Sequence, residues 1–238
     1  MNMEGHIKSG ECMKGLNGML THAYVGVAHS LGVSAPEVKK LKSLADKMSK
    51  TRSDLEELMF RQFGADPLAT TKVYYGGATR TTAELFSLDD NGNEEMLDTT
   101  LGHGTPNSRR RKMSTEAHIK TAFMLKAIDE VIDSVITYVP RNVFQKLKRQ
   151  QMRLMFRTRF ELEKRMIAEH GQRESLPVRG DTDIYYWKSV GVDLVTHDRE
   201  TKEEVSRRRL PPPSEGYTKV RTNPMTHGLE ATSHHHHH

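Results

Sequence analysis

A row of cations between residues 141 and 160 is the clearest candidate for binding chemistry. This segment holds seven Arg or Lys residues and no acidic residue. Four of them recur at steps of three and four, and therefore share one helix face: Lys146, Arg149, Arg153 and Arg157. Such a row is spaced to neutralise phosphates, so it predicts a nucleic-acid-binding surface. The alternatives are a solvated helix face and a face that pairs with the acidic helical hairpin.

A second candidate is the turn between the first two expected helices, which resembles a DNA-reading helix-turn-helix motif. Gly32 occupies the turn, and Ala28 lies where the helices come closest. The expected apolar positions are Val27, Leu31, Val33, Val38 and Leu41. In this interpretation Lys39 and Lys40 bind phosphates rather than bases. An ordinary helical hairpin needs the same apolar residues and the same glycine, so both interpretations stay open.

The C-terminal segment combines a basic cluster with prolines, and we expect it to be a partner-binding arm. Its residues are Arg207, Arg208, Arg209, Pro211, Pro212 and Pro213. The cluster resembles a polyproline ligand with a leading arginine, although Ser214 stands where the second anchor proline would be. A stiff, extended docking segment fits this composition. Arg109, Arg110 and Arg111 form another basic cluster in an expected loop.

Residues suited to catalysis or metal binding form no recognisable set. Asp129, Glu130 and Asp133 are close enough on one helix to bind a metal, but no Glu-x-x-His partner accompanies them. A solvent-facing polar stripe is the preferred interpretation. Phosphate-loop, dinucleotide-binding, nucleophile-elbow and metalloprotease motifs are missing. We therefore expect no enzyme, no catalytic residue, no metal and no cofactor.

Two helical pairs must position these residues. Apolar residues at steps of three and four predict a helix over about residues 12–31. A second is expected to begin at Ser34, with Glu37 completing a capping box, and to run to Phe63. Ser114 is expected to cap a third helix that ends before Pro140. The fourth covers residues 141–170, with one apolar side: Phe144, Leu147, Met152, Met155, Phe156, Phe160 and Ile167.

The remaining segments favour strands and loops. Residues 71–75 and 81–88 are rich in β-prone side chains, and Asp90-Asn91-Gly92 favours a hairpin turn. A strand pair is expected over residues 183–194, built on Ile184 to Trp187. The expected organisation is a helical hairpin over 1–66, a β-hairpin and basic loop over 67–113, a basic helical hairpin over 114–171, a strand pair and arm over 172–233, and a His tag at 234–238.

Composition and charge limit the function classes. Residues 1–107 carry 11 basic and 14 acidic side chains, a net charge of −3, whereas residues 108–238 carry 25 and 17, a net charge of +8. This asymmetry indicates an acidic partner for the C-terminal half. The single cysteine excludes an intramolecular disulfide. No apolar run or export signal is recognised, so we expect no membrane partner and a cytoplasmic protein, in a host cell or a virion if viral.

These observations predict a mainly α (α+β) fold of two long antiparallel helical hairpins, a small β-hairpin insertion and an extended C-terminal arm. In outline this resembles viral or phage structural proteins such as head-to-tail adaptors and nucleocapsid subunits. The leading hypothesis is a non-enzymatic assembly protein that forms homo-oligomers, contacts DNA or RNA and meets neighbouring structural proteins. The alternative is a helix-turn-helix DNA-binding regulator or a DNA-packaging recognition subunit.

Overall fold

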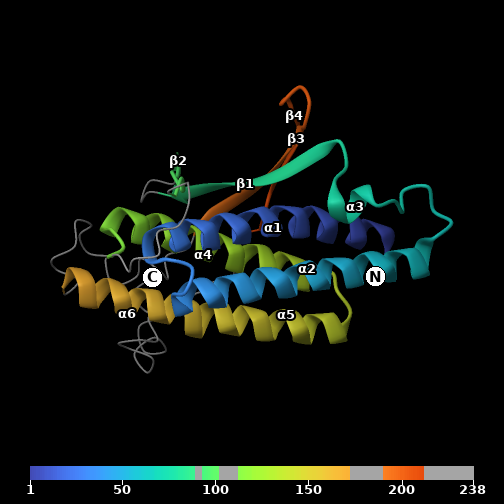
Figure 1. Ribbon diagram of the computed structural model, residues 1–238. Coiled ribbons are helices and arrows are strands. Elements are labelled where there is room, and N and C mark those ends of the chain that lie inside the picture. The colour runs from blue at the N-terminus through green and yellow to red at the C-terminus, as the bar shows by residue number, and fades with distance from the viewer. Residues whose placement is uncertain (89–92, 102–111, 172–189, 212–238) are drawn as a thin grey trace.

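The computed structural model describes residues 1–88, 93–101, 112–171 and 190–211 (Figure 1). Helices α1 and α2 lie side by side, with α5 and α6 along one side of α2 and a twisted sheet across α1. The fold is mainly α (α+β), as predicted, and its strands form one four-stranded antiparallel sheet. Within the described ranges, no helix has both the length and the hydrophobicity needed to cross a bilayer.

The first helical pair forms the predicted antiparallel hairpin. Helix α1 spans Met3–Leu31 and α2 spans Pro36–Phe63. Helix α1 begins earlier than expected because the Asn2 side chain accepts a hydrogen bond from the Gly5 amide at 2.7 Å and caps it. Gly32 ends α1 with φ at 88°, and its amide donates to the Ala28 carbonyl.

The predicted capping box at the start of α2 is wrong. Ala35 occupies the N-cap position and makes no side-chain cap hydrogen bond, while Ser34 is exposed. Glu37 instead pairs with Arg165 at 2.8 Å, and both side chains are largely buried. Because this pair joins α2 to α6, Glu37 stabilises the tertiary packing rather than the local helix end.

The second helical pair consists of α4, Thr115–Ile136, and a composite helix. The Ser114 hydroxyl accepts from the Ala117 amide at 3.1 Å, which confirms the predicted cap. Helix α5, Arg141–Arg153, continues through a π-helical turn, η1, Leu154–Thr158, into α6, Arg159–His170. The predicted apolar side is partly wrong. Leu147 is buried as expected, but Phe144 and Met152 are exposed, and Val143 and Leu154 face the core instead.

The sheet combines strands from distant parts of the chain in the order β2-β1-β3-β4. Their bounds are β1 Thr79–Leu88, β2 Glu94–Met96, β3 Gly191–Asp198 and β4 Glu204–Arg209. The antiparallel pairing of β1 with β2 confirms the predicted hairpin, although its Asp90-Asn91-Gly92 turn lies outside the described residues. The strand predicted around Ile184 to Trp187 also lies outside them, as do Arg109, Arg110 and Arg111.

The strand predicted over residues 71–75 is wrong. Lys72–Tyr75 forms a short helix, α3, which ends at Gly76 with φ at 84°. Tyr74 is fully buried, and its hydroxyl lies 2.7 Å from Nδ1 of His6 in α1. Burial of this one large side chain against α1 outweighs the β preference of its neighbours.

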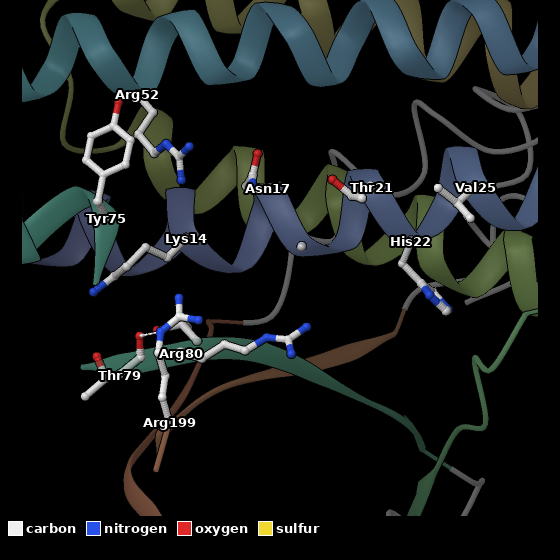
Figure 2. A pocket seen from close by; sticks show the side chains of 12 residues that line it. Lys14, Asn17, Thr21, His22, Val25, Arg52, Tyr75, Thr79, Arg80 and Arg199 are labelled. Atoms are coloured by element: carbon white, nitrogen blue, oxygen red, sulfur yellow. Dashed lines mark hydrogen bonds between the residues drawn. The ribbon is translucent and has the colours of Figure 1, made fainter. Parts of the chain in front are cut away.

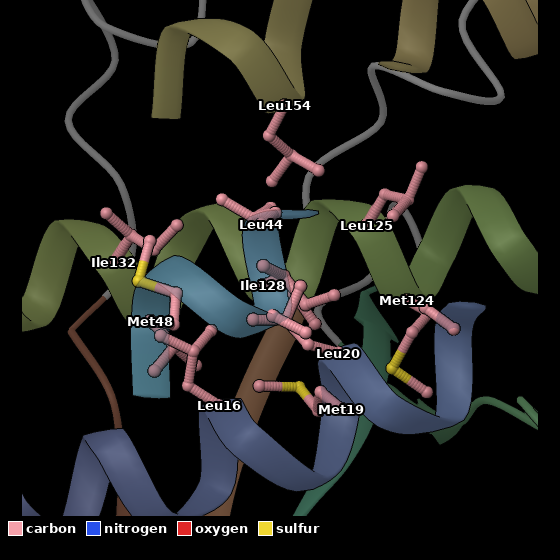
Figure 3. Packing of buried hydrophobic residues seen from close by; sticks show 14 of the residues in the cluster. Leu16, Met19, Leu20, Leu44, Met48, Met124, Leu125, Ile128, Ile132 and Leu154 are labelled. Atoms are coloured by element: carbon pink, nitrogen blue, oxygen red, sulfur yellow. The ribbon is translucent and has the colours of Figure 1, made fainter. Parts of the chain in front are cut away.

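One hydrophobic core joins the two helical pairs. Figure 3 shows Leu16 and Leu20 of α1 beside Leu44 and Met48 of α2 and Ile128 of α4. The core also includes Val192 and Leu194 of β3. All these side chains are at most 4% exposed, so the sheet and both helical pairs pack together.

Candidate nucleic-acid interface

The predicted cations of two distant segments meet in one groove between α2 and the composite helix. This basic groove has a volume of about 360 Å³. Its lining residues are Lys39, Lys40, Ser43, Leu44, Lys47, Gln150, Arg153, Leu154, Arg157 and Thr158. Lys39, Arg153 and Arg157 are exposed, whereas Lys40 and Lys47 are half-buried. Five cations therefore line the groove, and none of its described lining residues is acidic.

Helical periodicity on both walls explains this arrangement. On α2, Val38, Leu41 and Ala45 point into the core, which leaves the lysines on the flank. On the opposite wall, η1 inserts an extra residue into the helical turn. Leu154 and Thr158 are buried, and Arg153 and Arg157 precede them at the rim. The sequence predicted the spacing of the cations along the helices, but it did not predict the π-helical turn or the inclusion of Lys47.

The charges of the basic groove are not neutralised within the described part of the chain. No described carboxylate oxygen lies within 4.0 Å of its five cations. Nearby ion pairs involve other residues of α2, such as Lys42 with Asp46 at 3.5 Å. Five like charges repel one another, so an anion in the groove would relieve that repulsion.

The remaining two predicted cations of the row lie elsewhere. Lys146 lines a different hollow together with Asp54, Glu57 and Arg61 of α2. Arg149 is exposed and is not among the lining residues of the basic groove. The row is therefore divided along the helix, and Lys146 lies beside Asp54, Glu57 and Arg61 of α2.

The α1–α2 connection has the geometry of a long hairpin rather than that of a crossed helix-turn-helix. Ser49 donates to Asn17 at 3.4 Å, and Gln62 lies 2.8 Å from His6, so the helices touch along their whole length. Val33, expected to be buried in the motif, is 63% exposed. Lys39 and Lys40 thus face the composite helix instead of beginning an isolated recognition helix.

The expected basic arm begins with a strand. Arg207 pairs with Glu84 at 2.7 Å, and Arg208 pairs with Glu11 at 2.5 Å. Arg209 pairs with Glu94 at 2.5 Å. These three predicted arm residues belong to β4 and form ion pairs with other residues of the same chain, because strand pairing with β3 brings them close to acidic side chains. Pro211 is exposed, and Pro212 and Pro213 lie outside the described residues.

The arginines of β4 also control the ionisation of Asp193 in β3. Burial favours the neutral carboxyl group, but hydrogen bonds from Arg209 and Arg207 outweigh it and lower the pKa of Asp193. The Arg207 contact is 3.0 Å long. This network stabilises the sheet edge, and its cations are engaged within the protein.

Two residues of the acidic trio of α4 are buried and Asp133 is half-buried, which corrects the predicted solvent-facing stripe. Asp129 and Glu130 are at most 6% exposed, and Asp129 lies 3.8 Å from Nζ of the buried Lys126. Gln151 of α5 donates to Asp133 at 2.5 Å. The charges face inward because residues of the composite helix, including the fully buried Arg159, pack against α4. The described residues contain no group of three His, Cys, Asp or Glu placed to hold a metal.

Comparison with known proteins identifies no relative. No protein-family model matches the chain, and neither a curated protein nor a solved structure shows significant similarity to it.

Proposed function

We propose that this chain is a non-enzymatic assembly protein that binds the phosphate backbone of DNA or RNA in its basic groove. One observation carries the proposal. Lysines from α2 and arginines from the composite helix line the same groove, with no acidic residue among its described lining. Clustered cations on one face are the electrostatic signature of nucleic-acid binding.

The chemistry of the basic groove favours backbone binding over base reading. Its polar groups besides the cations are Ser43, Gln150 and Thr158. Lys and Arg contacts to phosphate fix the position of a nucleic acid but do not select its sequence. The protein would therefore bind many sequences, as suits a packaging or coating subunit, and its affinity would fall steeply with salt.

The assembly part of the proposal draws on the edges of the sheet. Strand β4 is an edge strand, and no described strand pairs with its outer side. Val205 in this strand is 58% exposed. An edge strand with an apolar side chain can pair with a second copy of the chain. We therefore propose a homo-oligomer, with neighbouring structural proteins as further partners and a virion or host cytoplasm as its setting.

The groove is tested by neutralising four of its cations at once. The groove variant carries Lys40→Ala, Lys47→Ala, Arg153→Ala and Arg157→Ala. Binding of tag-free protein to labelled 20-nucleotide DNA and RNA is followed by fluorescence anisotropy between 50 and 200 mM salt. We expect affinity to fall about tenfold or more at low salt. The slope of log K against log salt should become shallower by about 3 for double-stranded DNA.

A matched control removes the same charge elsewhere on these helices. It carries Lys50→Ala, Arg141→Ala, Lys146→Ala and Lys164→Ala, all at exposed positions outside the basic groove. This variant should retain most of its affinity. Equal losses in both variants would mean that only net charge matters, and full affinity in the groove variant would exclude the proposed site.

A further inference from the structure

A second cationic hollow lies on the sheet side of the α1–α2 hairpin, away from the basic groove. This cationic pocket has a volume of about 430 Å³, within the range of small-molecule sites. Figure 2 shows Lys14 of α1 and Arg80 and Arg199 of the sheet region around the gap between α1 and β1. Arg52 of α2 and Tyr75 of α3 close its other side.

Four cations from four parts of the fold line the cationic pocket without described acidic neighbours at bonding distance. No described carboxylate oxygen lies within 4.0 Å of Lys14, Arg52, Arg80 or Arg199. Lys14 donates to the Lys72 carbonyl, at 3.3 Å, and Arg199 donates to the Thr79 carbonyl, at 3.1 Å. Glu11, one turn before Lys14 on α1, pairs with Arg208 instead.

The cations also carry an energetic cost that a bound anion would relieve. Burial lowers the pKa of Lys14, because its ammonium group is partly removed from water. Nε of Arg52 is buried and has no hydrogen-bond partner among the described residues. Its guanidinium group lies 4.2 Å from the centre of the Tyr75 ring, which holds it in place.

The rest of the lining is suited to oxygen-rich ligands. Asn17, Thr21 and Thr79 supply neutral hydrogen-bonding groups. At Gly18, a Cβ atom would meet no atom within 4 Å, so the helix surface leaves room for a ligand there. A volume of about 430 Å³ exceeds what one phosphate group needs, and four cations exceed the charge of one phosphate.

We propose that the cationic pocket binds a ligand with two or more linked phosphate groups, either a nucleoside triphosphate or an inorganic oligophosphate. Arginine guanidinium groups match phosphate oxygens in pairs, and the lysine adds a point charge. This site differs from the basic groove in its position and in its lining residues. It is an addition to the proposed nucleic-acid binding and does not depend on it.

The proposal is tested by calorimetric titration of the full-length, tag-free protein with sodium tripolyphosphate. We expect one site per chain. The pocket variant Arg80→Ala with Arg199→Ala removes two exposed cations and should weaken binding about tenfold or more. The control Arg61→Ala with Lys164→Ala removes the same charge from exposed positions outside the pocket and should bind as the unmodified protein does.

A second variant tests the space itself. Gly18→Leu places a side chain into the cationic pocket without changing any charge, and leucine is a better helix former than glycine. It should fold, as judged by circular dichroism, and should lose tripolyphosphate binding. The groove variant should bind tripolyphosphate normally, which separates this site from the nucleic-acid interface.

A parallel titration with ATP under the same conditions tests for a nucleotide ligand. Tighter binding of ATP than of tripolyphosphate would assign a nucleotide ligand, and equal binding would assign an oligophosphate. Both results support the site. Three results overturn it. The first is that neither probe binds the unmodified protein saturably, and the second is that the pocket variant and its control lose equal affinity. The third is that the unmodified protein does not bind tripolyphosphate while the pocket variant loses affinity for nucleic acid. The last would make these cations part of a nucleic-acid surface.

Discussion

At the scale of single residues, the most informative side chains are polar groups inside the protein. His6 of α1 links two other elements, since Nδ1 contacts the Tyr74 hydroxyl and Nε2 contacts the Gln62 side-chain carbonyl at 2.8 Å. A neutral histidine with Nε2 protonated satisfies both bonds, donating to Gln62 and accepting from Tyr74. Burial lowers the pKa of His6, which favours this neutral form.

Two buried groups should give the folding free energy opposite dependences on pH. Burial raises the pKa of Glu130 above the ordinary carboxyl range, against the attraction of Lys126. The folded protein holds this proton more tightly than the unfolded chain, so the contribution of Glu130 is present at low pH and lost as the pH rises. Burial lowers the pKa of His118 to about 3, so its contribution is present above about pH 6.5 and lost on acidification.

We predict that Glu130→Gln and His118→Gln change the pH profile in opposite directions. The free energy of unfolding is measured in urea between pH 4.5 and 8. The free energy of unfolding of Glu130→Gln, relative to that of the unmodified protein, should increase as the pH rises, by up to about 1.4 kcal/mol per pH unit. The relative free energy of unfolding of His118→Gln should increase as the pH falls. Parallel profiles for all three proteins would contradict the prediction.

At the scale of elements, the close approach of α3 to α1 depends on Gly10. A Cβ atom at this position would lie 2.0 Å from the Val73 carbonyl oxygen, which is rigid backbone. Gly18 lies two turns further along the same helix and has open space around it. The two glycines therefore have different structural roles, although each weakens the helix by a similar intrinsic amount.

We predict opposite effects of alanine at these two glycines. Gly10→Ala should push α3 away from α1 and lower stability by about 1–3 kcal/mol, the range for overpacking. Gly18→Ala should raise stability by up to about 1 kcal/mol through helix propensity alone. Thermal unfolding of both variants provides the measurement. A stable Gly10→Ala protein would mean that α3 does not pack tightly on α1.

At the scale of the whole molecule, the first part of the expected arm is the strand β4, which belongs to the sheet, and the second part is the segment after Pro211. Removal of residues from 203 onward would take away the pairing of β4 with β3, the arginine ion pairs and the buried Leu210. Such a deletion cannot test assembly without also damaging the sheet. A deletion that begins at residue 212 leaves all contacts among the described residues in place.

We predict different outcomes for truncation after Pro211 and after Lys202. The first protein should unfold at the same temperature as the full chain and should still assemble, because it keeps the exposed edge of β4. The second should lose about 3 kcal/mol or more of unfolding free energy and fail to assemble, since it removes the pairing of β4 with β3, the arginine ion pairs and the buried Leu210. Light scattering after gel filtration at low and high salt measures assembly, and loss of assembly after the shorter truncation would assign the contact to the residues after Pro211 instead of β4.

The sequence by itself determined the four long helical segments and the helix ends at Ser114 and Gly32, because periodicity and end signals are local properties. It also identified four of the five cations that line the basic groove, all except Lys47. It could not predict that they face each other, since that depends on how α2 packs against the composite helix. Only the tertiary structure decided which apolar stripe of that helix is buried, that Asp129 and Glu130 face inward, and that β4 joins β3. These outcomes depend on contacts between residues far apart in the chain, which local patterns do not encode.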